Sequence, residues 1–225
     1  MTNIPSAMPS ETKGLVYRER PADGLPAGLL VLHHGRGTDE LDLLRIADLL
    51  DPHARLHVVS PRAPLRLDGS PGYHWYVVRR VGYPDPDTFH ASYSLLGALH
   101  DELWASSQIP THRTILAGFS MGSVMSYATG LGRGRPRPGA ILAFSGFIPT
   151  VDGWEADLQA RAALPVLIAH GRNDPVIDVA FAHRARNLLE DAGLEVTHLE
   201  SDAGHHIDPA QLQHAARWIE GMLPD

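Results

Sequence analysis

The chain has no cysteine among its 225 residues, which excludes disulfide bonds, thiolate zinc sites, iron–sulfur clusters and a cysteine nucleophile. It also has no apolar run near the ~20 residues that a membrane-spanning helix needs. The N-terminus lacks a charged segment followed by an apolar stretch, so we predict no signal peptide and expect a cytoplasmic protein. Basic residues are outnumbered, 19 against 26 acidic ones, and the formal charge of −7 disfavours nucleic-acid binding.

Length and composition indicate one globular domain. A chain of this length fits a single α/β domain, and 44% hydrophobic with 20% charged residues is ordinary for a folded protein. We predict that the domain covers residues 13–225 and that residues 1–12 form a flexible N-terminus. The Gly- and Pro-rich stretch 130–138, with three arginines, is predicted to be a solvated surface turn.

Short apolar runs alternate along the chain with longer amphipathic segments. The runs are rich in Leu, Val and Ile and apolar on both faces, which is typical of parallel strands covered by helices on each side. Strands are predicted at residues 28–34, 55–60, 114–119, 140–144, 165–170 and 194–199, with an edge strand at 13–18. Helices are predicted at 40–50, 87–106, 123–131, 176–191 and 209–222. This alternation predicts a doubly wound, mostly parallel α/β sheet.

The most informative motif is Gly118-Phe119-Ser120-Met121-Gly122. It begins at the end of a predicted strand and leads into a predicted helix. In that context a G-x-S-x-G sequence forms a sharp turn that presents its serine at a helix N-terminus, and the glycines avoid collisions of a Cβ with neighbouring elements. The same pentapeptide also fits a serine that only caps a helix after a glycine turn, so by itself it leaves both interpretations open.

A serine nucleophile needs a base, and the base needs an orienting carboxylate. Asp174 follows the predicted strand at 165–170, although Asp before Pro is also typical of a helix N-cap. His205 follows the next predicted strand, directly after a glycine, and is predicted to be the base; its neighbour His206 stays an alternative. The order serine, acid, histidine, each at the end of a different strand, is that of serine hydrolases built on α/β sheets.

A glycine-rich loop after the strand at 28–34 predicts an oxyanion hole. Acyl transfer requires preorganised N–H donors for the developing oxyanion. One donor is expected from Met121, the residue after the serine, and the second from the amide of Arg36 between two glycines. The loop lacks the lysine and the spacing of a P-loop, which disfavours nucleotide binding. His33 and His34 point to opposite faces of a strand, so no metal site is predicted there.

Together these motifs resemble the phospholipase/carboxylesterase family, small α/β hydrolases without a large cap that include acyl-protein thioesterases. The similarity runs from about residue 28 to residue 223 and rests on LHHGRGTDELDL, SPRAP, GYHWY, GFSMG, FSGFIP, HGRNDPVI and AGHHIDP. It implies an α/β-hydrolase fold with a triad of Ser120, Asp174 and His205, and with oxyanion amides from Arg36 and Met121. It also implies that Trp75 lies near the site and that Phe147 and Ile148 line an acyl pocket, although by residue type alone a tryptophan such as Trp75 belongs more often to the core than to a pocket.

Three positions depart from the family pattern. Family members usually carry an apolar residue, commonly leucine, where Arg36 stands, and often glutamine where Met121 stands; a histidine at His206 is not expected. Backbone amides tolerate the first two changes, so the mechanism is expected to persist. Arg36 is expected either to narrow the pocket or to attract an acidic substrate.

The sequence thus predicts a serine carboxylesterase that hydrolyses small or medium-chain carboxylic esters through an acyl-enzyme, with no cofactor and no metal. The segment between the serine and the aspartate is too short for a large helical lid, which favours small or extended soluble esters. A thioesterase or lysophospholipase with the same triad is one alternative, and a silent hydrolase fold that only binds ligand is another. The expected partner is a small-molecule ester; stable membrane insertion is not expected, and a homodimer is compatible with the sequence.

Overall fold

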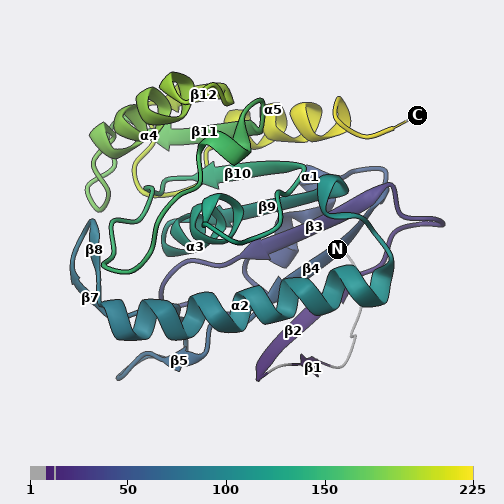
Figure 1. Ribbon diagram of the computed structural model, residues 1–225, viewed down its shortest axis with the longest axis horizontal. Coiled ribbons are helices and arrows are strands. Elements are labelled where there is room, and N and C mark those ends of the chain that lie inside the picture. Colours follow the sequence, from purple (N-terminus) through teal and green to yellow (C-terminus); the bar gives the residue numbers. More distant parts are fainter. Residues whose placement is uncertain (1–8, 13, 225) are drawn as a thin grey trace.

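The central element of the molecule is an eight-stranded sheet with the strand order β1-β2-β4-β3-β9-β10-β11-β12 (Figure 1). The computed structural model describes residues 9–12 and 14–224. The sheet is parallel from β4 to β12, and only β1 and β2 run antiparallel to their neighbours. Its strands are β1 (Ser10–Thr12), β2 (Leu15–Arg20), β3 (Gly28–His33), β4 (Leu56–Pro61), β9 (Thr114–Phe119), β10 (Ala140–Phe144), β11 (Pro165–Gly171) and β12 (Glu195–Ser201).

Helices cover both faces of the sheet, as the strands' double-sided apolar character requires. The helices are α1 (Ala47–Leu50), α2 (Pro86–Ser107), α3 (Met121–Leu131), α4 (Ala180–Asp191) and α5 (Pro209–Glu220). Alternate residues of β3 face opposite layers: Leu29 and Val31 pack with α2 and α3, whereas Leu30 and Leu32 pack with α1 and α5. The layer with α2 and α3 also holds α4, which packs on β11 and β12 (Figure 1). No helix among residues 9–12 and 14–224 has the length and apolar character to cross a bilayer.

Short segments outside the sheet build up the region beyond the carboxyl ends of the strands. Two small hairpins, β5 (Leu65–Arg66) with β6 (Tyr73–His74) and β7 (Val78–Arg80) with β8 (Tyr83–Pro84), fill the stretch between β4 and α2. The Gly37 amide donates to the Tyr73 carbonyl over 2.8 Å, which holds β6 against the glycine-rich loop after β3. Single 3-10 turns form at Leu43–Ile46, Thr111–Arg113 and Gln159–Arg161.

The predicted doubly wound α/β sheet and its strands are confirmed, with differences at the edge. The predicted edge strand at 13–18 is β2, and β1 lies outside it. Of the segment predicted to be flexible, residues 1–8 lie outside the described part of the chain, and Ser10–Thr12 form β1. The prediction that residues 13–225 form one domain stays a prediction.

The predicted helix at 40–50 forms only from residue 43 onward, and there as a 3-10 turn, Leu43–Ile46, followed by the single α-helical turn of α1. The Asp39 carboxylate accepts the Leu41 amide in a local turn, and the buried Glu40 carboxylate binds the Arg62 guanidinium over 2.5 and 2.6 Å. These contacts hold the start of the segment in a turn, so the tertiary ion pair overrides the helical pattern.

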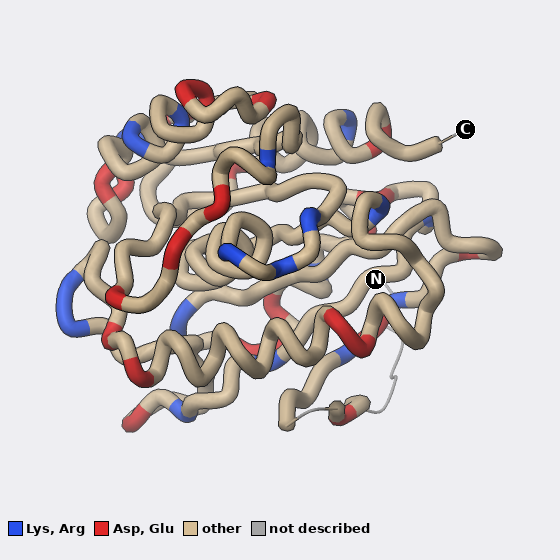
Figure 2. The backbone as a smooth tube through the Cα atoms, in the orientation of Figure 1, with Lys and Arg blue, Asp and Glu red and all other residues tan. Residues whose placement is uncertain are grey.

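The arginines of the predicted surface turn at 130–138 are not all solvated. Its basic positions gather in front of α3 (Figure 2). Arg133 pairs with Glu155 at the surface, but Arg135 is mostly buried and binds the Asp101 carboxylate over 2.7 and 3.0 Å. From the other side, the buried Arg161 donates to the carbonyls of Gly130, Gly132 and Arg135 over 2.7, 3.2 and 2.8 Å. The turn is therefore a hydrogen-bonded part of the fold.

Replacing Arg161 by methionine is expected to lower the free energy of unfolding by about 2–4 kcal/mol, because three carbonyl groups inside the protein each lose a hydrogen bond from the guanidinium. Urea denaturation monitored by circular dichroism measures the change. The control is Arg133→Met, which removes an exposed ion pair and should stay within about 0.5 kcal/mol of the wild type. Equal losses in both variants would contradict a structural role for Arg161.

Candidate active site

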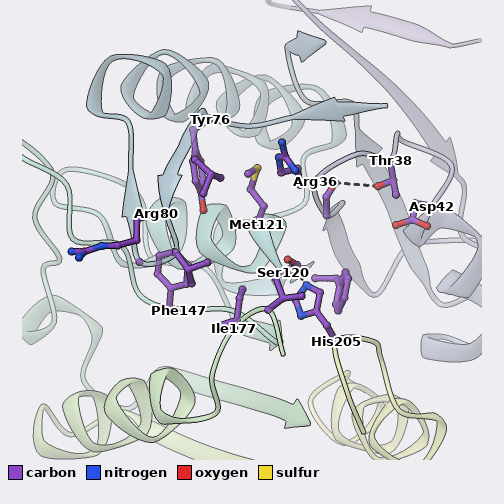
Figure 3. A pocket seen from close by; sticks show the side chains of 16 residues that line it. Arg36, Thr38, Asp42, Tyr76, Arg80, Ser120, Met121, Phe147, Ile177 and His205 are labelled. Atoms are coloured by element: carbon purple, nitrogen blue, oxygen red, sulfur yellow. Dashed lines mark hydrogen bonds between the residues drawn. The ribbon is translucent and has the colours of Figure 1, made fainter. Parts of the chain in front are cut away.

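Ser120 lies in a strained turn between β9 and α3. Its backbone has φ 54° and ψ −120°, a conformation that L residues seldom adopt, and its side chain is nearly buried. A Cβ on Gly118 would lie 2.4 Å from the carbonyl carbon of Gly122, and one on Gly122 would lie 1.9 Å from the carbonyl oxygen of His33. Both glycines are therefore required for this turn, and the turn aims the serine hydroxyl away from the sheet into a cavity (Figure 3).

Three of the predicted site residues are joined by hydrogen bonds. Ser120 Oγ lies 2.8 Å from His205 Nε2, and His205 Nδ1 lies 2.7 Å from Asp174 Oδ2. Because an ionised carboxylate can only accept, Nδ1 carries the imidazole proton, and Nε2 accepts the hydrogen bond from the serine hydroxyl. The three side chains come from loops after β9, β11 and β12, at the carboxyl edge of the sheet.

The environment of Asp174 favours its ionised form. Burial opposes ionisation, but the hydrogen bond from His205 and those from the amides of Ile177 and Val176 outweigh it and lower the pKa of this carboxyl group. The two amides donate to Oδ1 over 2.9 and 2.8 Å, which leaves Oδ2 for the imidazole. Asp174 thus also caps the turn that follows it, and α4 begins only at Ala180 instead of at the predicted residue 176.

A second histidine, His170, lies behind the carboxylate. Its Nε2 donates to the Ile177 carbonyl over 2.8 Å and is 3.4 Å from Asp174 Oδ2. Burial lowers the pKa of His170, so this ring is neutral and leaves the carboxylate charge for His205. His170 ends the predicted strand at 165–170 and opens the HGRNDPVI motif, but no role in the site was predicted for it.

His205 and His206 have different surroundings. The His205 ring packs on Phe119, with ring centroids 5.0 Å apart, and its two nitrogens contact Ser120 and Asp174. His206 is exposed, and its backbone amide donates to the Gly204 carbonyl over 3.0 Å. Of the two candidates, the fold brings only His205 to the serine.

The loop after β3 and the start of α3 lie next to each other at the edge of the cavity over Ser120. The Gly122–His33 approach packs the first turn of α3 on the end of β3. Within the described chain, the amides of Arg36 and Met121 donate to no other backbone group, so both are available to a ligand at this edge. Figure 3 shows these two residues side by side above Ser120. Two free N–H donors next to a serine hydroxyl can bind an oxyanion.

His34 anchors the loop that carries Arg36. Its Nε2 accepts the Ala63 amide over 2.9 Å, so Nδ1 carries the proton and donates to the Gly35 carbonyl over 2.7 Å. Thr38 Oγ1 donates to the same carbonyl over 3.1 Å. Burial lowers the pKa of His34, which keeps the ring neutral and its tautomer constant. The loop is therefore preorganised without a ligand.

The cavity over Ser120 has a volume of about 450 Å³. Its walls are mainly apolar, and Arg36, Thr38, Asp42 and Arg80 add polar groups around it. Of the predicted substrate-binding residues, Phe147 lines this cavity, whereas Ile148 lines a neighbouring cavity of about 520 Å³ that shares Phe147 as a wall. The remaining lining residues are Gly35, Tyr76, Val78, Val81, Gly82, Phe119, Met121, Val176, Ile177 and His205.

Trp75 lies behind the cavity and not in its wall. Its ring is fully buried, its Nε1 donates to the His34 carbonyl over 2.9 Å, and its backbone amide contacts Met121 Sδ at 3.2 Å. The next residue, Tyr76, faces the cavity instead (Figure 3). Burial raises the pKa of the Tyr76 hydroxyl, which keeps it neutral. The motif GYHWY does not by itself tell which of its aromatic side chains faces the cavity, so Tyr76 was not predicted.

Comparisons with known proteins agree with this arrangement. The family model described as phospholipase/carboxylesterase matches residues 21–223. The chain belongs to this family. Among its relatives is the acyl-protein thioesterase 1 of Debaryomyces hansenii, 27% identical over 179 residues, which are 75% of this chain and 77% of that protein. Another is the esterase YpfH of Escherichia coli strain K12, 28% identical over 205 residues, 87% of this chain and 83% of that protein.

Solved structures give the same α/β-hydrolase fold. The crystal structure of esterase PE8 superposes with a TM-score of 0.81 at 31% identity, covering 93% of this chain and 99% of that chain. The expected phospholipase/carboxylesterase resemblance and fold are thereby confirmed. As in the expectation, the sheet of this family member carries no large cap: short hairpins and loops rim the cavity in the described part of the chain.

Replacing Asp174 by asparagine should reduce the acid sensitivity of the fold. Since the pKa of Asp174 is lowered on folding, its ionised form stabilises the protein above the unfolded pKa of about 3.9 and this contribution disappears as the pH falls through the folded pKa. Between neutral pH and pH of about 3, the wild type should lose more free energy of unfolding than Asp174→Asn. Urea denaturation at a series of pH values gives both slopes. If the free energy of unfolding fell equally with pH in both proteins, the lowered pKa of Asp174 would be contradicted.

Proposed function

We propose that this family member is a serine carboxylesterase that hydrolyses small or medium-chain carboxylic esters through an acyl-enzyme. The observation that carries the proposal is the pair of hydrogen bonds from Ser120 to His205 (2.8 Å) and from His205 to Asp174 (2.7 Å) at the floor of the cavity. In this order, the hydroxyl can act as the nucleophile of acyl transfer, the imidazole as its base, and the carboxylate as the group that orients the base. The substrate partner is then a small-molecule ester.

In the first half of the reaction, Ser120 Oγ attacks the carbonyl carbon of the ester while His205 Nε2 takes the hydroxyl proton. The carbonyl oxygen becomes negative and accepts hydrogen bonds from the amides of Arg36 and Met121. Asp174 stabilises the imidazolium that forms and keeps its ring oriented. His205 then gives its proton to the departing alkoxide, which leaves as the alcohol, and the acyl group stays on Ser120.

In the second half, water replaces the alcohol. His205 takes a proton from the water, whose oxygen attacks the acyl carbon, and the same two amides stabilise the second oxyanion. The bond to Ser120 Oγ breaks, the serine recovers its proton from His205, and the carboxylic acid leaves. The N–H donors are preorganised by the His34 and Gly122 contacts, so little reorganisation accompanies either step.

Exchange of His205 for alanine should lower kcat/KM for p-nitrophenyl butyrate by about 10⁴-fold or more, and Ser120→Ala should do the same, since these residues act as a unit. The matched control is His206→Ala, which removes the exposed neighbouring ring and should keep the wild-type rate within about threefold. Labelling by a fluorophosphonate probe, followed by peptide mapping, should locate the modified residue at Ser120.

Two results would contradict this mechanism. One is retention of activity in His205→Ala with loss in His206→Ala. The other is a wild type that neither hydrolyses esters from acetate to octanoate nor reacts with the probe, which would favour a fold that only binds ligand. The Debaryomyces hansenii relative is named a thioesterase. Comparing the rates with an ester and with the thioester of the same acyl chain distinguishes a carboxylesterase from a thioesterase.

Acyl-chain preference should depend on Phe147, because this residue lines both the cavity over Ser120 and the neighbouring cavity of about 520 Å³. In Phe147→Val the two cavities should join, and the ratio of kcat/KM for octanoate to that for butyrate should rise by about tenfold, the effect of burying a few more methylene groups. The control Ile148→Val alters only the second cavity and should leave the ratio unchanged. A constant ratio in Phe147→Val would show that acyl chains lie elsewhere.

A further inference from the structure

A cluster of nitrogen and oxygen donors lies on the outer edge of the sheet, apart from the proposed catalytic residues. His183 is on α4, and His198 and Glu200 are on β12, where residues two apart point to the same face. That face is the one that α4 covers (Figure 1). Among the described residues, these three make up the only group of three or more His, Asp or Glu side chains with donor atoms close enough to share one ion.

The distances within the cluster suit a metal ion. His183 Nε2 lies 2.7 Å and His198 Nε2 lies 3.7 Å from Glu200 Oε1, and all three donor atoms are within 4.8 Å of one another. A tetrahedral zinc ion with bonds of about 2.0–2.2 Å holds its ligand atoms roughly 3.3 Å apart. This value lies between the two distances from Glu200, so small side-chain movements suffice.

The side chain of His198 gives a second, independent indication that the cluster binds an ion. Its side chain is only 10% exposed, and its Nε2 is buried without a hydrogen-bond partner. Buried polar atoms are rarely left unpaired, since each costs the free energy of its lost hydration. This nitrogen faces the cluster, where its distance to Glu200 Oε1 is too long for a hydrogen bond. An ion between the two groups would satisfy both.

We propose that His183 Nε2, His198 Nε2 and Glu200 Oε1 bind one divalent transition-metal ion of the zinc type. Two imidazoles and one carboxylate are ligands that such ions accept, with water as the fourth ligand, whereas calcium and magnesium prefer sites built from oxygen alone. Binding uses the lone pair of His183 Nε2, so the hydrogen bond between His183 and Glu200 is replaced by two bonds to the ion, and the neutral imidazole carries its proton on Nδ1.

The two neighbouring arginines have opposite effects on metal binding. Arg172 Nε donates to Glu200 Oε2 over 3.0 Å, which directs the other carboxylate oxygen at the cluster. Arg186 Nη1 lies 3.5 Å from His198 Nδ1, a nitrogen that must carry the proton when Nε2 binds a metal. The Arg186 donor therefore opposes binding and has to move. Its side chain is more than one-third exposed and otherwise contacts Glu190 and Asn187, so this movement is open to it.

The bound ion would connect α4 to the edge strand β12. An ion held by side chains from two elements binds the folded chain and not the unfolded one, in which these side chains are far apart. Binding therefore stabilises the folded state by mass action. We therefore expect Zn²⁺ to raise the melting temperature of the wild type. The esterase reaction uses none of these three residues, so the site and the proposed function succeed or fail separately.

Isothermal titration of the EDTA-treated, dialysed full chain with Zn²⁺ tests the site. The wild type should bind one ion per chain, and His183→Ala and Glu200→Gln should each weaken binding by at least about 10–100-fold. Arg186→Gln should tighten binding by about threefold or more, because its amide oxygen can accept the Nδ1 proton. The matched control is His53→Ala, which breaks an exposed His–Glu pair of 3.7 Å with Glu220 and should leave the affinity unchanged.

The proposal is overturned if the wild type shows no saturable binding, or if affinity survives in both His183→Ala and Glu200→Gln. It is also overturned if binding disappears in His53→Ala, or in His205→Ala, where the ion would be using the proposed catalytic residues. Circular dichroism of each variant in EDTA establishes that it is folded before titration. His183 is half exposed on α4, so its removal leaves the fold intact.

Discussion

The close approach of α3 to the end of β3 is the contact on which the rest of the site depends. Without a Cβ at Gly122, the helix meets the His33 carbonyl directly, and without one at Gly118 the strand β9 turns into α3 in a single residue. Ser120 takes up the strain of this turn at φ 54°. The same contact sets the first amide of α3 beside the loop after β3, so one steric constraint positions both the hydroxyl and the two free N–H donors.

Neutral buried histidines surround this contact, and a single ionised carboxylate completes it. Burial lowers the pKa of His33 and of His34, so both rings act through hydrogen bonds and carry no charge. His33 reaches Ser126 on α3 and His34 holds the loop. Asp174 keeps its negative charge because amides and His205 bind both of its oxygens. The charge in hydrogen-bond contact with the imidazole is then the one that stabilises imidazolium.

The parts of the site that lie at strand ends followed from the sequence, and the parts built by remote segments did not. Ser120, Asp174 and His205 each follow an apolar run, and parallel strands deliver their carboxyl ends to one edge of the sheet. Arg80 reaches the cavity from β7 and Tyr76 from the bend between β6 and β7, in a segment of short hairpins whose pairing no local pattern encodes. For the same reason Trp75 was expected beside the site but lies behind it, and the helix predicted from residue 40 begins only at residue 43, after Glu40 has paired with Arg62.

Apolar period and glycine placement act locally, so the sequence predicted the succession of strands and helices along the chain, the two-sided burial of the sheet, the family, and the serine, aspartate and histidine at its carboxyl edge. Tertiary packing was needed to see that His205, predicted over its alternative His206, is the ring that reaches the serine, that Phe147 lines two neighbouring cavities, and that His183 meets His198 and Glu200. Those outcomes depend on which way neighbouring side chains point once helices and loops from distant parts of the chain pack together, and a linear pattern does not contain that direction.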